Sequence, residues 1–227
     1  MQRIRVWDVY VRLFHWALVL AVLVSFYTMK TEAKPFLFPA EVHAKAGYIV
    51  LGLLAFRWFW GIVGSFFARF ATFLRSPQTS LDYAWGLIKR NPQPYAGHNP
   101  IGGWMVLVML LSLTFQGVSG LFLSDDIFFE APLYAALGQD VSKTLLTLHN
   151  YNATLLLVLI GLHLGAIVLH RLLGEKLVGA MFTGNKRLPG PPVDAAPDSP
   201  TLTQRPLWLG LVAIAGAASV SLTWWFW

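Results

Sequence analysis

Five of the six histidines in this sequence lie inside long apolar stretches: His15, His43, His149, His163 and His170. Ionisable side chains at membrane depth are costly, so by default they indicate function. Any one of them could simply hydrogen-bond a neighbouring helix, but five together are harder to explain in that way. An imidazole in such a place is a good ligand for a metal or for haem iron.

The spacing of two of these histidines suits stacked sites. His149 and His163 are fourteen residues apart, which in an α-helix is ~21 Å along the axis and only about 40° around it. Both side chains can therefore face the interior of one helix bundle, one above the other. Glycines lie close to the histidines, namely Gly47, Gly161 and Gly165. They would let a flat ring approach the backbone, although helix packing by small residues is the preferred explanation for the glycines taken alone.

The composition indicates that these histidines lie in a membrane protein. Of the 227 residues, 56% are hydrophobic and only 12% are charged, against a globular norm near ~25% charged. There is no cysteine, which excludes disulfides, cysteine-ligated zinc, iron–sulfur clusters and covalently attached c-type haem. The net charge of +6 comes from basic residues spread between apolar blocks. This pattern is that of a membrane protein and gives no basis for a nucleic-acid partner.

Five apolar blocks are long enough to cross a bilayer as helices. The predicted fold is an all-α integral membrane protein, with a four-helix di-haem bundle (1–187), a proline-rich cytoplasmic linker (188–206) and a fifth C-terminal transmembrane helix (207–227). The first block is read as a retained span because no small-residue cleavage site follows it. Two short interfacial helices are expected around Ala68–Leu74 and Ser80–Lys89. The blocks are Leu13–Met29, Val42–Val63, Ile101–Leu123, Thr144–Leu173 and Leu207–Trp227.

The distribution of lysine and arginine predicts the orientation. Most of the 17 basic residues lie before the first block, between the second and third, and between the fourth and fifth. Positive loops stay inside, so we expect a cytoplasmic N-terminus and a C-terminus on the outer side. The predicted outer side carries more acids than cations. These acids are Glu32, Glu41, Asp125, Asp126, Glu130 and Asp140.

This orientation sorts the histidines into two pairs of equal depth. His15 and His163 lie near the inner face, and His43 and His149 lie near the outer face. Each pair could hold one haem through both axial positions, which favours electron transfer over oxygen activation. A single zinc ion could not join two such layers. Di-iron carboxylate sites and most proton pumps need Asp or Glu inside the spans, and the five blocks contain neither.

The other two histidines have simpler interpretations. His170, beside Arg171 at the inner end, is expected to be structural or to snorkel towards the interface. His98 precedes Asn99 and Pro100. This order is typical of a polar helix start, with Asn99 as the N-cap and Pro100 at the first helical position. The alternative for His98 is a role on the substrate side.

Several short motifs occur together between residue 1 and about residue 185. They are Trp7-Asp8, Arg12-Leu13-Phe14-His15-Trp16, Arg57-Trp58-Phe59-Trp60-Gly61, Ala68-Arg69-Phe70, Gly97-His98-Asn99-Pro100-Ile101-Gly102-Gly103, and His149 with His163. Together they resemble those of the bacterial cytochrome b561 / nickel-hydrogenase cytochrome b subunit family.

The resemblance implies a four-helix di-haem b core in a bacterial inner membrane, with His15, His43, His149 and His163 as the iron ligands and a periplasmic C-terminus. It also implies electron transfer between the quinone pool and a partner, which is a periplasmic hydrogenase, a c-type cytochrome, another oxidoreductase or superoxide. Minimal members have four helices and lack the fifth span.

The leading functional prediction is a transmembrane electron wire with one haem b near each face. Arg57 is expected to pair with a haem propionate, because a buried cation needs a partner; the alternative is snorkelling to the interface. Arg12, Trp16 and His98 are candidates for a quinone site near the inner haem. An acidic outer face favours a basic periplasmic redox protein, such as a c-type cytochrome or a hydrogenase-like complex, over superoxide. Two other functions stay open: a stand-alone quinone-coupled oxidoreductase acting on a small molecule such as superoxide, and a membrane anchor without a redox role.

Overall fold

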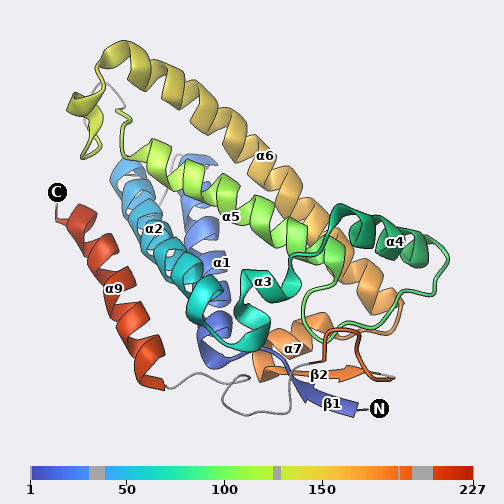
Figure 1. Cartoon of the computed structure of the whole chain (residues 1–227). Coiled ribbons are helices and arrows are strands. Elements are labelled where there is room, and N and C mark those ends of the chain that lie inside the picture. Colours follow the sequence, from blue (N-terminus) through green and yellow to red (C-terminus); the bar gives the residue numbers. More distant parts are fainter. Residues whose placement is uncertain (1, 31–38, 125–128, 189, 196–206, 227) are drawn as a thin grey trace. The chain divides into compact units, whose positions relative to one another are not determined.

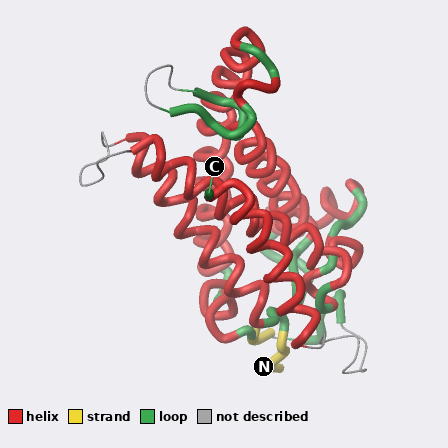
Figure 2. The backbone as a smooth tube through the Cα atoms, turned by 90° about the vertical axis from the view of Figure 1, so that its left-hand side faces the viewer, coloured by secondary structure: helices red, strands yellow, loops and turns green. Residues whose placement is uncertain are grey.

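The computed structural model describes residues 2–30, 39–124, 129–188, 190–195 and 207–226. Most of this chain is α-helical, and two short strands complete the regular structure (Figures 1 and 2). Five helices have the length and apolar composition of membrane spans. They are α1 (Val9–Lys30), α2 (Pro39–Val63), α5 (Pro100–Gly120), α6 (Gln139–Leu172) and α9 (Leu207–Trp225). The predicted all-α integral membrane fold is therefore confirmed, with span boundaries that differ from the prediction by a few residues.

The longest helix exceeds the thickness of a bilayer. The 34 residues of α6 correspond to about 51 Å of helix, whereas the hydrocarbon core is about 30 Å thick. The first part of α6, including Asp140 and Lys143, lies before its apolar section and is exposed. α6 thus tilts or extends beyond the apolar layer.

Shorter elements connect the spans. A 3-10 turn, η1 (Phe66–Ala68), leads into α3 (Phe70–Phe73), and α4 (Pro77–Ile88) follows. Ser76 caps α4 by accepting a hydrogen bond from the Thr79 amide. The exposed side of α4 carries Leu81, Trp85 and Ile88, as expected for an interfacial helix. A second 3-10 turn, η2 (Tyr134–Ala136), precedes α6, and α7 (Leu177–Thr183) follows it.

The chain divides into two compact units, and each is described by itself. The first unit comprises residues 1–13, 57–108 and 159–211, and the second comprises residues 14–56, 109–158 and 212–227. All five spans contribute to both units. The division into a four-helix core, a linker and a fifth span stays a prediction.

In the first unit a strand pair holds the N-terminus. β1 (Gln2–Arg5) pairs antiparallel with β2 (Asn185–Leu188), and both strands were missed because four-residue strands leave no clear periodicity. Gly184 ends α7 with φ +79°, and its carbonyl accepts hydrogen bonds from the amides of Val6 and Trp7. A Cβ at Gly184 would lie 2.6 Å from the Trp7 carbonyl oxygen, so this turn requires glycine.

The beginning of the predicted linker packs against the first unit. Leu188 is fully buried beside Val6 and Phe67, and the Asp194 carboxylate accepts hydrogen bonds from the amides of Ala96 and Gly97. Residues 188 and 190–195 are thus not the extended tether that was predicted. Residues 189 and 196–206 lie outside the described part of the chain.

In the second unit α9 packs closely on α2. A Cβ at Gly52 would overlap the Ser221 hydroxyl and would lie 2.5 Å from the Ala217 carbonyl oxygen. Near the end of α9, Val220 and Trp224 cover the buried side chains of Tyr48 and Leu51. Small residues allow this close approach, which is a common way of packing helices in membranes.

Candidate functional site

Two of the predicted ligands, His43 on α2 and His149 on α6, lie next to each other in the second unit, with their rings in an edge-on arrangement. Their ring centroids are 6.3 Å apart and the ring planes are inclined by 70°. A metal–imidazole nitrogen bond is about 2 Å long, and the ring centre lies about 1 Å further. Two imidazoles on opposite sides of one iron would therefore have centroids roughly 6 Å apart. The observed separation fits this arrangement.

A hydrogen bond fixes the tautomer of His43. Its Nδ1 lies 3.0 Å from the backbone carbonyl oxygen of Ser25 on α1. A carbonyl oxygen can only accept, so Nδ1 carries the proton and donates it. Nε2 is then the nitrogen with a free lone pair, which is the form that a metal ligand needs.

His149 is fixed in the same way, by a side chain of α5. Its Nδ1 lies 2.9 Å from the Ser119 hydroxyl, and this hydroxyl donates its own proton to the Gln116 carbonyl, at 3.1 Å. With its proton assigned to the Gln116 carbonyl, Ser119 accepts from Nδ1–H of His149, and this assignment leaves Nε2 of His149 unprotonated. Both rings thus keep their Nε2 lone pairs for a ligand.

The donor set suits haem better than a bare metal ion. Within the described residues no three His, Cys, Asp or Glu side chains gather in a way that could hold a metal ion. A pair of imidazoles supplies only the two axial ligands, and a porphyrin supplies the other four. Next to the pair, the described residues leave open space around the Cβ position of Gly47, one turn after His43. A flat macrocycle could approach the backbone there.

Arg57 is buried near the end of α2, in the first unit. The residue is 3% exposed, and its guanidinium carbon lies 4.9 Å from the ring of Phe70 and 5.9 Å from that of Phe73. Its Nη1 has no hydrogen-bond partner among the described residues. The alternative of snorkelling is therefore wrong, and the unsatisfied nitrogen fits a carboxylate supplied by a bound group such as a haem propionate.

His98 is held between aromatic rings in the same unit. Its ring centroid lies 4.7 Å from that of Trp7 and 4.6 Å from that of Phe73, and its Nδ1 has no hydrogen-bond partner within the described chain. Burial, with the charges of Arg57, His163 and Lys186, lowers the pKa of His98 to about 3. The ring is therefore neutral at physiological pH and lies within electrostatic reach of His163.

The two residues of the predicted inner pair belong to different units. His163 lies on α6 in the first unit, between Gly161 and Gly165, and the described chain leaves open space around the Cβ positions of both glycines. His15 lies on α1 in the second unit, where Trp16 packs edge-on against its ring at 5.0 Å. Each environment is compatible with a haem ligand, and the pairing itself stays a prediction.

The three residues predicted for a quinone site have different surroundings. Arg12 bonds to backbone carbonyls, those of Asp8 and Phe182, and so ties the start of α1 to α7. Arg12 and His98 belong to the first unit, and Trp16 belongs to the second. The quinone site stays a prediction.

The predicted helix start at Asn99 is confirmed. α5 begins at Pro100, and Asn99 Oδ1 accepts the Gly102 amide at 2.8 Å. The amide nitrogen of Asn99 lies 3.2 Å from Nε2 of His170. His170 is only 5% exposed, so its role is structural and the snorkelling alternative is wrong.

Sequence reasoning missed a buried ion pair beside His170. Lys186 Nζ lies 3.0 Å from Glu175 Oε2 and donates to the Tyr95 carbonyl at 2.8 Å. Burial alone would raise the pKa of Glu175, but His170 and Lys186 more than offset this and leave it below its usual value. The pair fastens the loop that carries His98 and Asn99. No spacing rule links residues this far apart in sequence.

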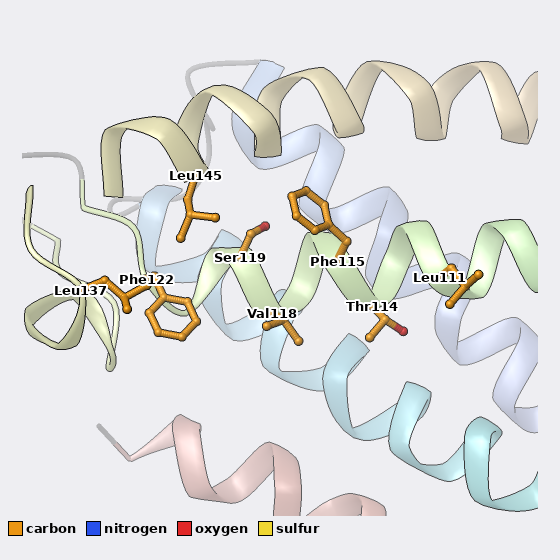
Figure 3. A pocket seen from close by; sticks show the side chains of 8 residues that line it. All are labelled: Leu111, Thr114, Phe115, Val118, Ser119, Phe122, Leu137 and Leu145. Atoms are coloured by element: carbon orange, nitrogen blue, oxygen red, sulfur yellow. The ribbon is translucent and has the colours of Figure 1, made fainter. Parts of the chain in front are cut away.

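An apolar cavity of about 490 Å³ lies along α5 in the second unit, with Ser119 and Thr114 as its polar lining residues (Figure 3). Neither His43 nor His149 lines it. The cavity is therefore not the space between the two imidazoles. Of its lining residues, Ser119 bonds to His149.

The comparison with known protein families decides the identity of the chain. The model of the family described as prokaryotic cytochrome b561 matches residues 6–184. The chain belongs to the prokaryotic cytochrome b561 family. Among curated proteins and solved structures, no match was found.

Membership in the cytochrome b561 family has direct consequences. Its members are membrane proteins that transfer electrons through b-type haem, and this is the general function of the chain. Together with five candidate spans, it makes the chain a multi-pass bacterial membrane protein. The family match ends at residue 184 and so does not include α9.

Proposed function

We propose that this cytochrome b561 carries electrons across the membrane through two b haems, each held by two histidines. His43 and His149 would hold the outer haem, and His15 and His163 the inner one. The observation that supports this proposal most is the 6.3 Å separation of the His43 and His149 rings. It is joined by the two hydrogen bonds that leave both Nε2 atoms free for iron.

The residues of the chain have distinct roles in this proposal. A haem held by two of these histidines would supply single-electron transfer rather than oxygen chemistry. The Ser25 carbonyl and the Ser119 hydroxyl orient the outer imidazoles. The apolar walls of the spans exclude water. At the inner level, Arg57 would neutralise a propionate, which its buried and unsatisfied Nη1 supports.

On the inner side, the proposal places exchange with the quinone pool. Arg12, Trp16 and His98 are the candidates, and of these His98 has the strongest support. Its ring is neutral, buried between aromatic groups and within reach of the charges of His163 and Arg57. A neutral imidazole with an unsatisfied nitrogen could hydrogen-bond a quinone oxygen. Arg12 has less support because two backbone carbonyls already accept from it.

On the outer side, we propose a periplasmic redox protein as partner, such as a c-type cytochrome or a hydrogenase-like complex. With the N-terminus in the cytoplasm, the outer segments carry more acids than cations, which suits a basic docking surface. Of these acids, Glu32, Asp125 and Asp126 lie outside the described residues. Docking of this kind predicts that electron transfer to an added basic cytochrome slows as salt rises. A rate that is independent of salt would contradict it, and rapid quinone reduction by superoxide alone would favour the stand-alone oxidoreductase.

The ligand assignment is tested by counting haems in purified variants. Wild-type protein should contain two b haems per chain, with low-spin reduced-minus-oxidised spectra. His43→Ala and His149→Ala should each disturb the same spectral component, and His15→Ala and His163→Ala the other. His170→Gln is the matched control, because it alters a buried histidine of α6 that the proposal does not use. Two intact low-spin haems in His149→Ala would refute the ligand assignment.

A further inference from the structure

A ladder of polar side chains joins α5 to α6 inside the membrane span. Ser112 donates to Asn152 Oδ1 at 2.7 Å, and the Asn152 amide donates to Gln116 Oε1 at 2.6 Å and to the Ser112 carbonyl at 3.0 Å. The ladder ends where Ser119 accepts from His149. All five residues belong to the second unit.

The spacing explains how the ladder forms. Ser112, Gln116 and Ser119 are separated by four and three residues and so share one face of α5. Three residues separate His149 from Asn152, which puts both on one face of α6. Ser112 is 8% exposed and Ser119 is 3% exposed. Buried hydroxyls in an apolar span are costly without partners, and these two have them.

The contact from Ser119 to His149 affects more than the orientation of the ring. A group that accepts from Nδ1–H makes the imidazole a more basic ligand. A more basic ligand stabilises ferric iron relative to ferrous iron, and hydrogen bonding around a ligand is one of the means by which a protein sets the potential of haem. The Ser119 hydroxyl donates its proton to the Gln116 carbonyl. The Ser119 oxygen is therefore a better hydrogen-bond acceptor than that of an isolated hydroxyl.

We propose that Ser119 is a positioning residue that lowers the reduction potential of the outer haem through its hydrogen bond with His149. The inference rests on the proposed function, because it needs His149 to be an iron ligand. α5 carries no histidine, so this assigns to that helix a part in the redox site. Gly120 supports the assignment, because a Cβ there would lie 3.5 Å from Cε1 of His149, which places the backbone of α5 next to the ring.

The two ligands of the outer pair differ in how they can be adjusted. The acceptor for His43 is the backbone carbonyl of Ser25, which no side-chain substitution removes. The acceptor for His149 is a side chain, so a single substitution can alter it.

The test is a spectroscopic redox titration of the full chain in lipid nanodiscs. Ser119→Ala should shift one of the two haem components to a more positive potential, with a roughly fivefold higher ratio of reduced to oxidised haem at a fixed potential. The shifted component should be the one that His43→Ala disturbs. Ser119→Thr keeps a hydroxyl and should titrate like wild type. Thr114→Val is the matched control, because it removes another hydroxyl of α5, one that donates to the Leu110 carbonyl of its own helix.

Other outcomes would overturn the inference. If Ser119→Ala holds both haems and titrates like wild type, Ser119 serves only to hold α5 against α6. Equal shifts of both components would also refute it. Should the alanine variant not fold, Ser119→Cys retains a weaker acceptor of similar size, and the inference then requires a smaller shift in the same direction. If wild-type protein instead binds no haem, the proposed function itself fails.

Discussion

The buried pair of Glu175 and Lys186 gives the sharpest prediction for stability. Lys186 is 6% exposed in its side chain and Glu175 is 21% exposed, and their charged atoms are 3.0 Å apart. Glu175→Gln removes the compensating charge from a buried ammonium group. Breaking a buried pair from one side costs about 3–5 kcal/mol. Lys186 still donates its hydrogen bond to the Tyr95 carbonyl in this variant, which offsets part of that cost. We therefore expect the free energy of unfolding to fall by about 2–4 kcal/mol.

The assay is thermal unfolding of the purified protein, followed by circular dichroism. The loss should lower Tm by roughly 5–10 °C. Lys186→Met should cost less, because Glu175 can still reach water, and the double variant should be less damaged than the sum of the single ones. Lys143→Met changes an exposed lysine and serves as control. Strictly additive effects of the two substitutions would show that the pair does not hold the loop in place.

Three further predictions concern other parts of the chain. Burial and nearby charges lower the pKa of His98 from 6.5 to about 3, so only the unfolded state gains a proton as the pH falls below 6.5. The free energy of unfolding should therefore drop between pH 6.5 and about 3, and His98→Gln should flatten that drop in urea unfolding. Replacing Arg57 by Met should lower the potential of the proposed inner haem, because a buried positive charge favours the reduced form. Arg57→Lys should lower it less, and an unchanged redox titration would argue against a propionate partner. Gly52→Leu should detach α9 from α2, because the leucine side chain would overlap the Ser221 hydroxyl. Faster proteolysis within residues 196–206 would report this. Gly216→Leu is the control, because the described chain leaves open space at that site.

The sequence predicted the spans well because each has about twenty apolar residues without an internal acid, a signal that depends on composition alone. It also predicted the cap at Asn99, because asparagine followed by proline is a local pattern. The facing of His43 and His149 agrees with the pairing by depth, although their role as ligands stays a prediction.

Other features depend on contacts between distant segments and could not be read from the chain. Ser119 was missed because one serine in an apolar helix looks like many others, and only its position opposite His149 gives it significance. The pair of Glu175 and Lys186 and the contact of Asp194 with the loop at Ala96 also join segments without a shared periodicity. The proline-rich composition of residues 188–206 suggested a free tether, but it does not show which side chains can dock.

The close contact of α9 with Gly52 has a consequence for assembly. A glycine notch on a transmembrane helix is the kind of surface onto which a helix of another subunit could dock. In this chain the notch is filled by the chain's own last helix, through Ala217 and Ser221. The chain's own last helix thus occupies this packing site, and any subunit that joins the protein in the bilayer must dock on another surface.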